Sequence, residues 1–245
     1  MGYWTTLHLF DEKVFYEKVV PELKGLNGNI KLDYLQFSKS HRTGGIEHFS
    51  ESELNIFLDN SIINVFNIAN SFDKTFKIHS QFHKIKEYDD RRLLLNELDG
   101  YYDFCKFFEY YIFKYCADFF PYIPLGKGGV FRNFNLNEKT LSYSIICELD
   151  SENEFFGCWD RMGISNWITN EDVELLYLDK ENLYFEGDTY ATEFMTLLEI
   201  AQKNKLGLIM GIDMRECTLE LLPKNKLISS DIWRETDTRG LLFKL

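Results

Sequence analysis

The chain has 245 residues, of which 45% are hydrophobic, and its 39 acidic and 27 basic side chains give a net charge of −12. This composition excludes an intrinsically disordered chain and supplies enough apolar surface for one large core or two modest ones. The excess of acidic residues argues against a nucleic-acid-binding surface, because phosphates require basic partners.

Neither a secretory signal nor a membrane span is expected. The N-terminal residues have no basic segment followed by an apolar one, and no run reaches the ~18 apolar residues that a span requires. The five cysteines are odd in number and show no CxxC spacing, which is typical of reduced thiols. These features predict a cytoplasmic protein without a membrane partner.

The chain begins with a predicted strand and helix. Residues 3–10 alternate like a half-buried strand, and Asp11 is the predicted N-cap of a helix from Glu12 toward Leu23, which Pro21 should kink or end. Residues 25–49 contain four glycines among residues of mixed polarity. We expect a loop there, with room for one short strand.

Two longer helices are expected next. Ser50 and Glu53 form a capping box ahead of the periodic segment 54–72. In residues 93–120 the charged side chains occupy about half of the helical circumference, and the aromatic and aliphatic ones occupy the other half. This second helix is predicted to lie at the centre of the core.

The prolines and glycines of residues 121–129 predict a connector, beyond which the pattern changes to strands. We expect a hairpin of 130–136 and 141–149, a helix at 189–203, and further strands at 173–178, 183–186, 206–214 and 241–245. The fold class is therefore predicted to be α+β, with a helix-rich N-terminal half packed on a largely antiparallel sheet from the C-terminal half. We expect a single domain of residues 1–245, subdivided into 1–120 and 130–245.

The familiar catalytic and ligand motifs are incomplete. The loop LGKGGVF, 125–131, has no Ser or Thr after its Gly-Lys pair, and His79 and His83 have the spacing of a zinc pair without the glutamate of HExxH. No GxSxG occurs, and since every histidine lies at or before His83, only a Cys–His pair in the order opposite to papain stays open. A possible calcium loop has Phe155 and Arg161 at its sixth and twelfth positions. We therefore expect no cofactor.

The acidic residues are concentrated in one segment. From Glu148 to Glu193 there are thirteen of them against only Arg161 and Lys180, a net charge of −11. One interpretation is a solvated surface that aids solubility, and the other is an acidic face for a basic partner, with interleaved aromatic residues as anchors. The second interpretation predicts these partner-binding residues: Glu152, Glu154, Trp159, Asp160, Glu171, Asp172, Glu174, Glu181, Tyr184 and Glu186.

Three hypotheses of function follow. The first is an acidic binding protein that captures a basic protein, most concretely an immunity-type inhibitor of a toxin or nuclease, by physical analogy alone. The second is an enzyme that holds a divalent metal with carboxylates, because period-two spacing in or after a strand would place Glu148, Asp150, Glu152 and Glu154 on one face. The third is a structural or self-assembling protein. The oligomeric state is left open.

Overall fold

A four-stranded antiparallel sheet lies at the centre of the part of the chain that the computed structural model describes, residues 4–40, 46–71, 101–127, 139–149, 163–184, 190–212 and 226–241. The strands are β1 (Trp4–Phe10), β2 (Ala117–Lys127), β3 (Gly163–Ile168) and β4 (Gly207–Ile212), in the order β2-β1-β4-β3. The α+β class is confirmed. The sheet takes two strands from the first 127 residues and two from the remainder.

The two central strands are apolar on both faces. In β1, Leu7 and Leu9 belong to one hydrophobic core, while Phe10 belongs to the other. In β4, Leu208 and Met210 lie on the first side and Ile209 on the second. This alternation follows from the period-two geometry of a strand, and it requires helices on both sides of the sheet.

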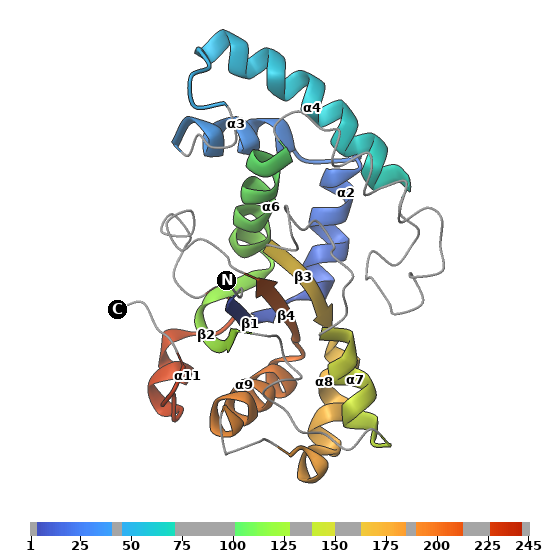
Figure 1. Ribbon diagram of the computed structural model, residues 1–245, viewed down its shortest axis with the longest axis vertical. Helices are drawn as coiled ribbons and strands as arrows, with labels where there is room; N and C mark the ends of the chain where they lie inside the picture. The colour runs from blue at the N-terminus through green and yellow to red at the C-terminus, as the bar shows by residue number, and fades with distance from the viewer. Residues whose placement is uncertain are drawn as a thin grey trace.

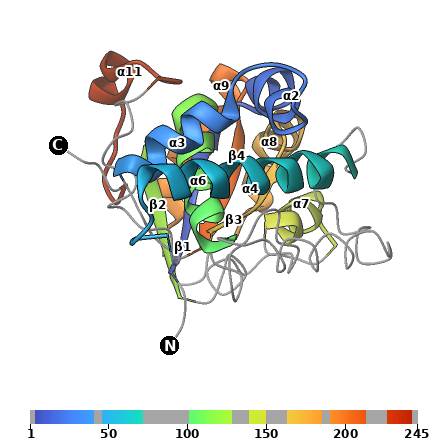
Figure 2. The ribbon, with the colours of Figure 1, turned by 90° about the horizontal axis from the view of Figure 1, so that it is seen from above.

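One side of the sheet is covered by the N-terminal helices and one central helix (Figures 1 and 2). A helical run from Glu12 to Leu23 contains α1 (Glu12–Val14), a π-helical stretch (Phe15–Val19) and α2 (Val20–Leu23). It is followed by α3 (Ile30–Ser40), α4 (Glu51–Ser71) and α6 (Tyr101–Tyr115). In both views α4 is the outermost of these helices.

The other side is covered by helices from the second half of the chain (Figure 1). They are α7 (Leu141–Leu149), α8 (Asn170–Leu178) with a 3-10 turn, η4 (Lys180–Asn182), then α9 (Ala191–Asn204) and the short α11 (Ser230–Glu235). Helix α8 lies between α7 and α9 (Figures 1 and 2). The sheet is thus the middle of three layers.

Several predicted elements are confirmed. Asp11 caps the first helix, since its Oδ1 accepts a hydrogen bond from the Val14 amide at 3.0 Å, and the helical run ends two residues after Pro21. Ser50 and Glu53 form the expected capping box, with each side chain accepting from the other's backbone amide. The strands at 3–10 and 206–214 and the helix at 189–203 match β1, β4 and α9 over the described residues.

The prediction of a loop at 25–49 is wrong, because these residues contain the helix α3. Gly28 and Asn29 mark the start of this helix, where Gly28 has a positive φ of 71° and Asn29 Oδ1 accepts from the Leu32 amide at 3.1 Å. The glycine at 28 therefore precedes a helix and does not belong to a long loop. Gly44 and Gly45 lie outside the described residues.

Two predicted boundaries are wrong. The helix predicted at 93–120 ends earlier, and most of the connector predicted at 121–129 is a strand. Helix α6 ends at Tyr115, and β2 then pairs with β1, with Ala117 opposite Phe10. Pro121 and Pro124 are tolerated in β2 because it is an edge strand of the described sheet, where a missing N–H breaks no ladder on the open side. Residues 93–100 and 128–129 lie outside the described part of the chain.

Two strands predicted in the second half are helices. In α7 the buried residues Ser142, Ile145, Ile146 and Leu149 recur with helical spacing, although the apolar residues also alternate. Residues 173–178 fall in α8, where Val173 and Leu176 are buried. Leu183, Tyr184 and Leu241 are not in strands, and residues 130–136, 185–186, 213–214 and 242–245 lie outside the described residues. The strand β3 and the helix α11 were not predicted.

Close packing of β3 on β4 requires a glycine at position 207. A Cβ at this position would lie 2.3 Å from the backbone carbonyl oxygen of Ile168, which cannot move without disturbing the ladder. Two residues earlier, Lys205 ends α9 in the left-handed conformation with φ 56°, which L side chains adopt at a cost.

Opposite effects are expected from two substitutions in this turn. Gly207→Ala should lower the free energy of unfolding by about 1–3 kcal/mol through overpacking. Lys205→Gly should raise it by about 0.5–1 kcal/mol because glycine relieves the left-handed strain. Urea denaturation followed by circular dichroism measures both, and equal signs for the two variants would contradict this account of the turn.

Candidate functional site

Helix α8 begins with a reciprocal capping box. Thr169 Oγ1 accepts a hydrogen bond from the Asp172 amide at 3.0 Å, and Asp172 Oδ2 accepts from the Thr169 amide at 3.0 Å. Two amides of the first turn that have no partner within the helix are thereby satisfied. Asp172, a predicted partner-binding residue, therefore holds the start of its own helix.

The sides of α8 have different surroundings. Val173 and Leu176 are buried in the core on the sheet. The next side faces α9, where Gln202 Nε2 donates to Glu174 Oε2 at 3.1 Å. The hydrogen bond and the charge of Glu199 raise the pKa of Lys203 on α9, and Tyr177 of α8 adds a smaller effect in the same direction. Glu174 is therefore engaged in holding α8 against α9.

The remaining side of α8 points into solvent. Glu171, Leu175 and Leu178 follow at i, i+4 and i+7, which places them within about 60° of one another on the helix and opposite the core-facing residues. Leu175 is 40% exposed and Leu178 is 79% exposed. The helix thus has a second apolar stripe that no described element of this chain covers.

The turn after α8 carries further exposed side chains. Asp179 accepts from the Ser142 amide at 3.1 Å and from the Asn182 side chain, so it joins the end of α8 to the start of α7. The Ser142 hydroxyl, which also donates to Asp179, and the Asn182 side chain hold the pKa of Asp179 below its usual range. Beside them Leu141 is 47% exposed, Glu181 is exposed, and Tyr184 is 61% exposed. We refer to Glu171, Leu175, Leu178, Glu181, Tyr184 and Leu141 as the α8 face.

The predicted partner-binding residues divide into three groups. Glu171, Glu181 and Tyr184 are exposed on the α8 face, whereas Asp172 and Glu174 have structural partners. Residues Glu152, Glu154, Trp159, Asp160 and Glu186 lie outside the described part of the chain. Leu141, Leu175 and Leu178 were not predicted. The signal for Leu175 and Leu178 is the sequence VELLYL, which has more apolar residues than one buried helical side can use.

The metal hypothesis depended on a strand around Glu148, and this strand is absent because Glu148 belongs to α7. Asp150, Glu152 and Glu154 lie outside the described residues, as do His79, His83 and most of the LGKGGVF loop. Within the described ranges no group of three or more His, Cys, Asp or Glu side chains has a geometry that would hold a metal ion. In the same ranges no helix is long and apolar enough to cross a membrane.

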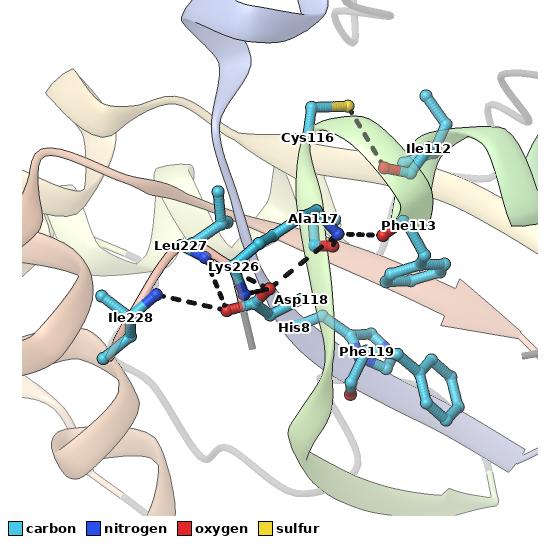
Figure 3. A network of polar contacts seen from close by, with 10 residues as sticks. All are labelled: His8, Ile112, Phe113, Cys116, Ala117, Asp118, Phe119, Lys226, Leu227 and Ile228. Carbon is cyan, nitrogen blue, oxygen red and sulfur yellow. Dashed lines mark hydrogen bonds and ion pairs between the residues drawn. The ribbon is translucent and has the colours of Figure 1, made fainter. Parts of the chain in front are cut away.

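A buried polar network ties the C-terminal segment to the sheet (Figure 3). Asp118, at the start of β2, accepts hydrogen bonds from the amides of Lys226, Leu227 and Ile228 at 3.0, 3.2 and 3.4 Å. The ammonium group of Lys226 lies 3.9 Å from Asp118 and donates to the carbonyl of Ala117 at 2.6 Å and to that of Phe113. Asp118 had been expected on the polar side of a helix, and its burial in β2 corrects that prediction.

This network is structural. Burial raises the pKa of Asp118 and lowers the pKa of Lys226, against the effect of their mutual attraction and of the three amide donors. Each group that burial desolvates has hydrogen-bond partners, as the low dielectric of the interior requires. Cys116 lies two residues before Asp118, and burial raises the pKa of its thiol, which therefore stays protonated and does not act as a nucleophile.

His8 is fully buried in β1. Its Nδ1 lies 2.9 Å from the Phe119 carbonyl and its Nε2 lies 2.8 Å from Thr6 Oγ1, while its ring packs on Phe119 and Phe113. A neutral ring that donates from Nδ1 and accepts from the Thr6 hydroxyl satisfies both nitrogens. Burial lowers the pKa of His8 to about 3, so the imidazole is a neutral core side chain at physiological pH.

No protein-family model matches the chain, no curated protein sequence is significantly similar to it, and no solved structure matches its fold. A functional proposal therefore depends on the geometry of the chain itself.

The buried His8 should make stability depend on pH. As the pH is lowered, His8 takes up a proton near pH 6.5 in the unfolded chain but only near pH 3 in the folded chain. Its contribution to the free energy of unfolding should therefore fall by about 1.4 kcal/mol for each pH unit by which the pH is lowered between those values. His8→Gln should show a shallower slope than wild type in urea denaturation across this range. The exposed His48→Gln serves as the control and should keep the wild-type slope; equal slopes in all three proteins would contradict the prediction.

Removing Asp118 should be strongly destabilising. Asp118→Ala leaves three amides without their acceptor and the Lys226 ammonium without its counter-charge, and it should lower the free energy of unfolding by about 3–5 kcal/mol. The double variant Asp118→Asn, Lys226→Met should lose less than the sum of its single variants, because the two groups act together. Asp237→Asn, in an exposed ion pair, is the matched control and should be nearly neutral.

Proposed function

We propose that this protein is an acidic, cytoplasmic binding protein that captures a basic protein partner through the α8 face, most concretely as an immunity-type inhibitor of a toxin or nuclease. The observation that carries the proposal is the exposure of Leu175 and Leu178 between the carboxylates of Glu171 and Glu181. Apolar anchors with a charged rim are the usual composition of a protein–protein interface.

The apolar part of the face supports binding and not only solubility. Single exposed apolar residues are normal, but neighbouring ones mark interaction sites. Full burial of a leucine side chain contributes about 1.5–3 kcal/mol, so a stripe of two leucines with Tyr184 nearby supplies anchors of useful strength. A surface that served solubility alone would place charged residues at 175 and 178.

The charge of the face supports a basic partner. Glu171 and Glu181 make no hydrogen bonds like those by which Asp172 and Glu174 hold α8 in place. In addition, the segment from 148 to 193 carries almost all of the chain's net charge. Such a field raises the rate of encounter with a basic protein and repels nucleic acid. The odd number of cysteines and the buried free thiol of Cys116 support a reducing compartment.

The proposal predicts salt-sensitive capture that depends on two carboxylates. Wild type and the variant Glu171→Gln, Glu181→Gln are immobilised and exposed to lysate of the source cell, in salt of about 10 mM and about 1 M, where the Debye lengths are ~30 and ~3 Å. We expect wild type at low salt to retain a basic protein, and the double variant to retain several-fold less of it. Asp172 and Glu174 are left unchanged because their loss would disturb α8 itself.

The matched control is Glu235→Gln, which removes one exposed carboxylate on α11 and should capture as wild type does. The retained protein is identified by mass spectrometry and assayed for nuclease activity or for toxicity when it is expressed with and without this chain. Suppression of that activity would support an inhibitor. Capture of acidic proteins, or capture that neither salt nor the double variant changes, would overturn the proposal.

A further inference from the structure

The α8 face offers a partner side chains and no free backbone groups. Its backbone N–H and C=O groups are used within α8, so a partner can touch only side chains there. A partner strand laid across this face would bury its own amides and carbonyls against leucine side chains without hydrogen-bond partners, which is costly. A helix satisfies its own backbone and avoids that cost.

The spacing of the face also fits a helix. Glu171 and Leu178 are seven residues apart, which is about 10 Å or two helical turns along α8. A second helix that packs along this stripe presents its own i, i+3, i+4 and i+7 residues over the same length. Carboxylates at the start of the stripe and in the turn after it, Glu171 and Glu181, are complementary to lysine or arginine at both ends of the partner's apolar stripe.

Among the described residues, Lys180 is the lysine closest in the chain to Leu178, and it does not oppose this arrangement. Lys180 Nζ lies 4.3 Å from the centre of the Tyr177 ring, and Tyr177 is on the side of α8 that faces α9. The cation is therefore directed away from Leu175 and Leu178. The outward stripe itself carries apolar and acidic side chains only.

We propose that the α8 face binds an amphipathic helix whose apolar stripe, about two turns long, has a basic residue at each end. This inference rests on the proposed function and adds to it the structural element by which the basic partner is recognised. Helix packs on helix over Leu175 and Leu178, and the basic ends pair with Glu171 and Glu181.

The test uses three synthetic peptides of about 18 residues, long enough to form a helix with a hydrocarbon staple. The first has leucines on one side with lysine at each end of the stripe, the second has glutamate in place of those lysines, and the third has the composition of the first with its leucines distributed around the helix. Binding to the full chain is measured by fluorescence anisotropy, and the contacted amides are located by NMR titration.

We expect the first peptide to shift amides of residues 171–184 and to bind at least about tenfold more tightly than the other two. Leu178→Ser should weaken its binding at least about tenfold. Leu26→Ser is the matched control, because Leu26 is 74% exposed but follows α2 on the opposite side of the sheet, and it should bind as wild type does. No shift at α8, equal binding of the three peptides, or an unchanged affinity of Leu178→Ser overturns the inference.

Failure of this inference and failure of the proposed function give different results. If a basic partner is captured in a manner that depends on Glu171 and Glu181 but not on Leu178, the proposed function stands and the helical mode is wrong. If the first peptide binds at α8 with the stated specificity while no basic protein depends on the two carboxylates, the helix-binding face stands and the proposed function is wrong.

Discussion

The central strands β1 and β4 carry apolar side chains on both faces, and this constraint determines the rest of the fold. Neither face of such a pair can be left in water, so each needs a layer of helices. The N-terminal helices with α6 cover one face, and α7, α8 and α9 cover the other (Figure 1). Val173 and Leu176 fix the rotation of α8 against the sheet, and that rotation points Glu171, Leu175 and Leu178 outward.

The acidic residues divide into those that hold elements of the fold together and those whose carboxylates are exposed to a partner. Asp118 is buried and holds the segment at 226–228, Asp172 caps α8, Glu174 contacts α9 and Asp179 joins α7. Each of these groups accepts hydrogen bonds that hold two elements or a helix end in place. Glu171 and Glu181 have no such role, which is why a count of acidic residues along the chain overstates the acidic surface, and why neutralising Asp172 or Glu174 would test folding together with binding.

The parts of the fold that sequence predicts well are those with a local signal. Asp11, Ser50 and Glu53 cap helices by contacts within four residues, and the apolar run of β4 is unambiguous. The errors arise where two periods coexist or where tertiary position decides. LSYSIICEL and VELLYL alternate as strands do and also repeat as helices do, and the prolines of β2 are acceptable only because the strand is at an edge of the described sheet.

In the candidate site, too, some residues have a local sequence signal, whereas others are decided by their tertiary position. The sequence indicates Glu171, Glu181 and Tyr184 through charge and aromatic content, but its pattern predicts a strand at 173–178 for the leucines between them. Only the helical wheel of α8, once Val173 and Leu176 are known to face the sheet, distinguishes a buried leucine at 176 from an exposed one at 178. An excess of apolar residues in a short helix thus indicates that the helix has two apolar sides. Which residues are exposed can be assigned only when the side that packs on the core is known.

An exposed leucine stripe is a liability, because it favours pairing of two copies of the chain through their apolar surfaces. Its carboxylates oppose that pairing. If two copies met through their α8 faces, Glu171 and Glu181 would approach the same groups of the second copy, and like charges held close together in an interface cost several kcal/mol. A partner with basic residues at those positions exchanges that repulsion for attraction without any change in the apolar contact. Under the proposed function, the leucines supply an apolar contact that does not discriminate between partners, and the two carboxylates select a basic one.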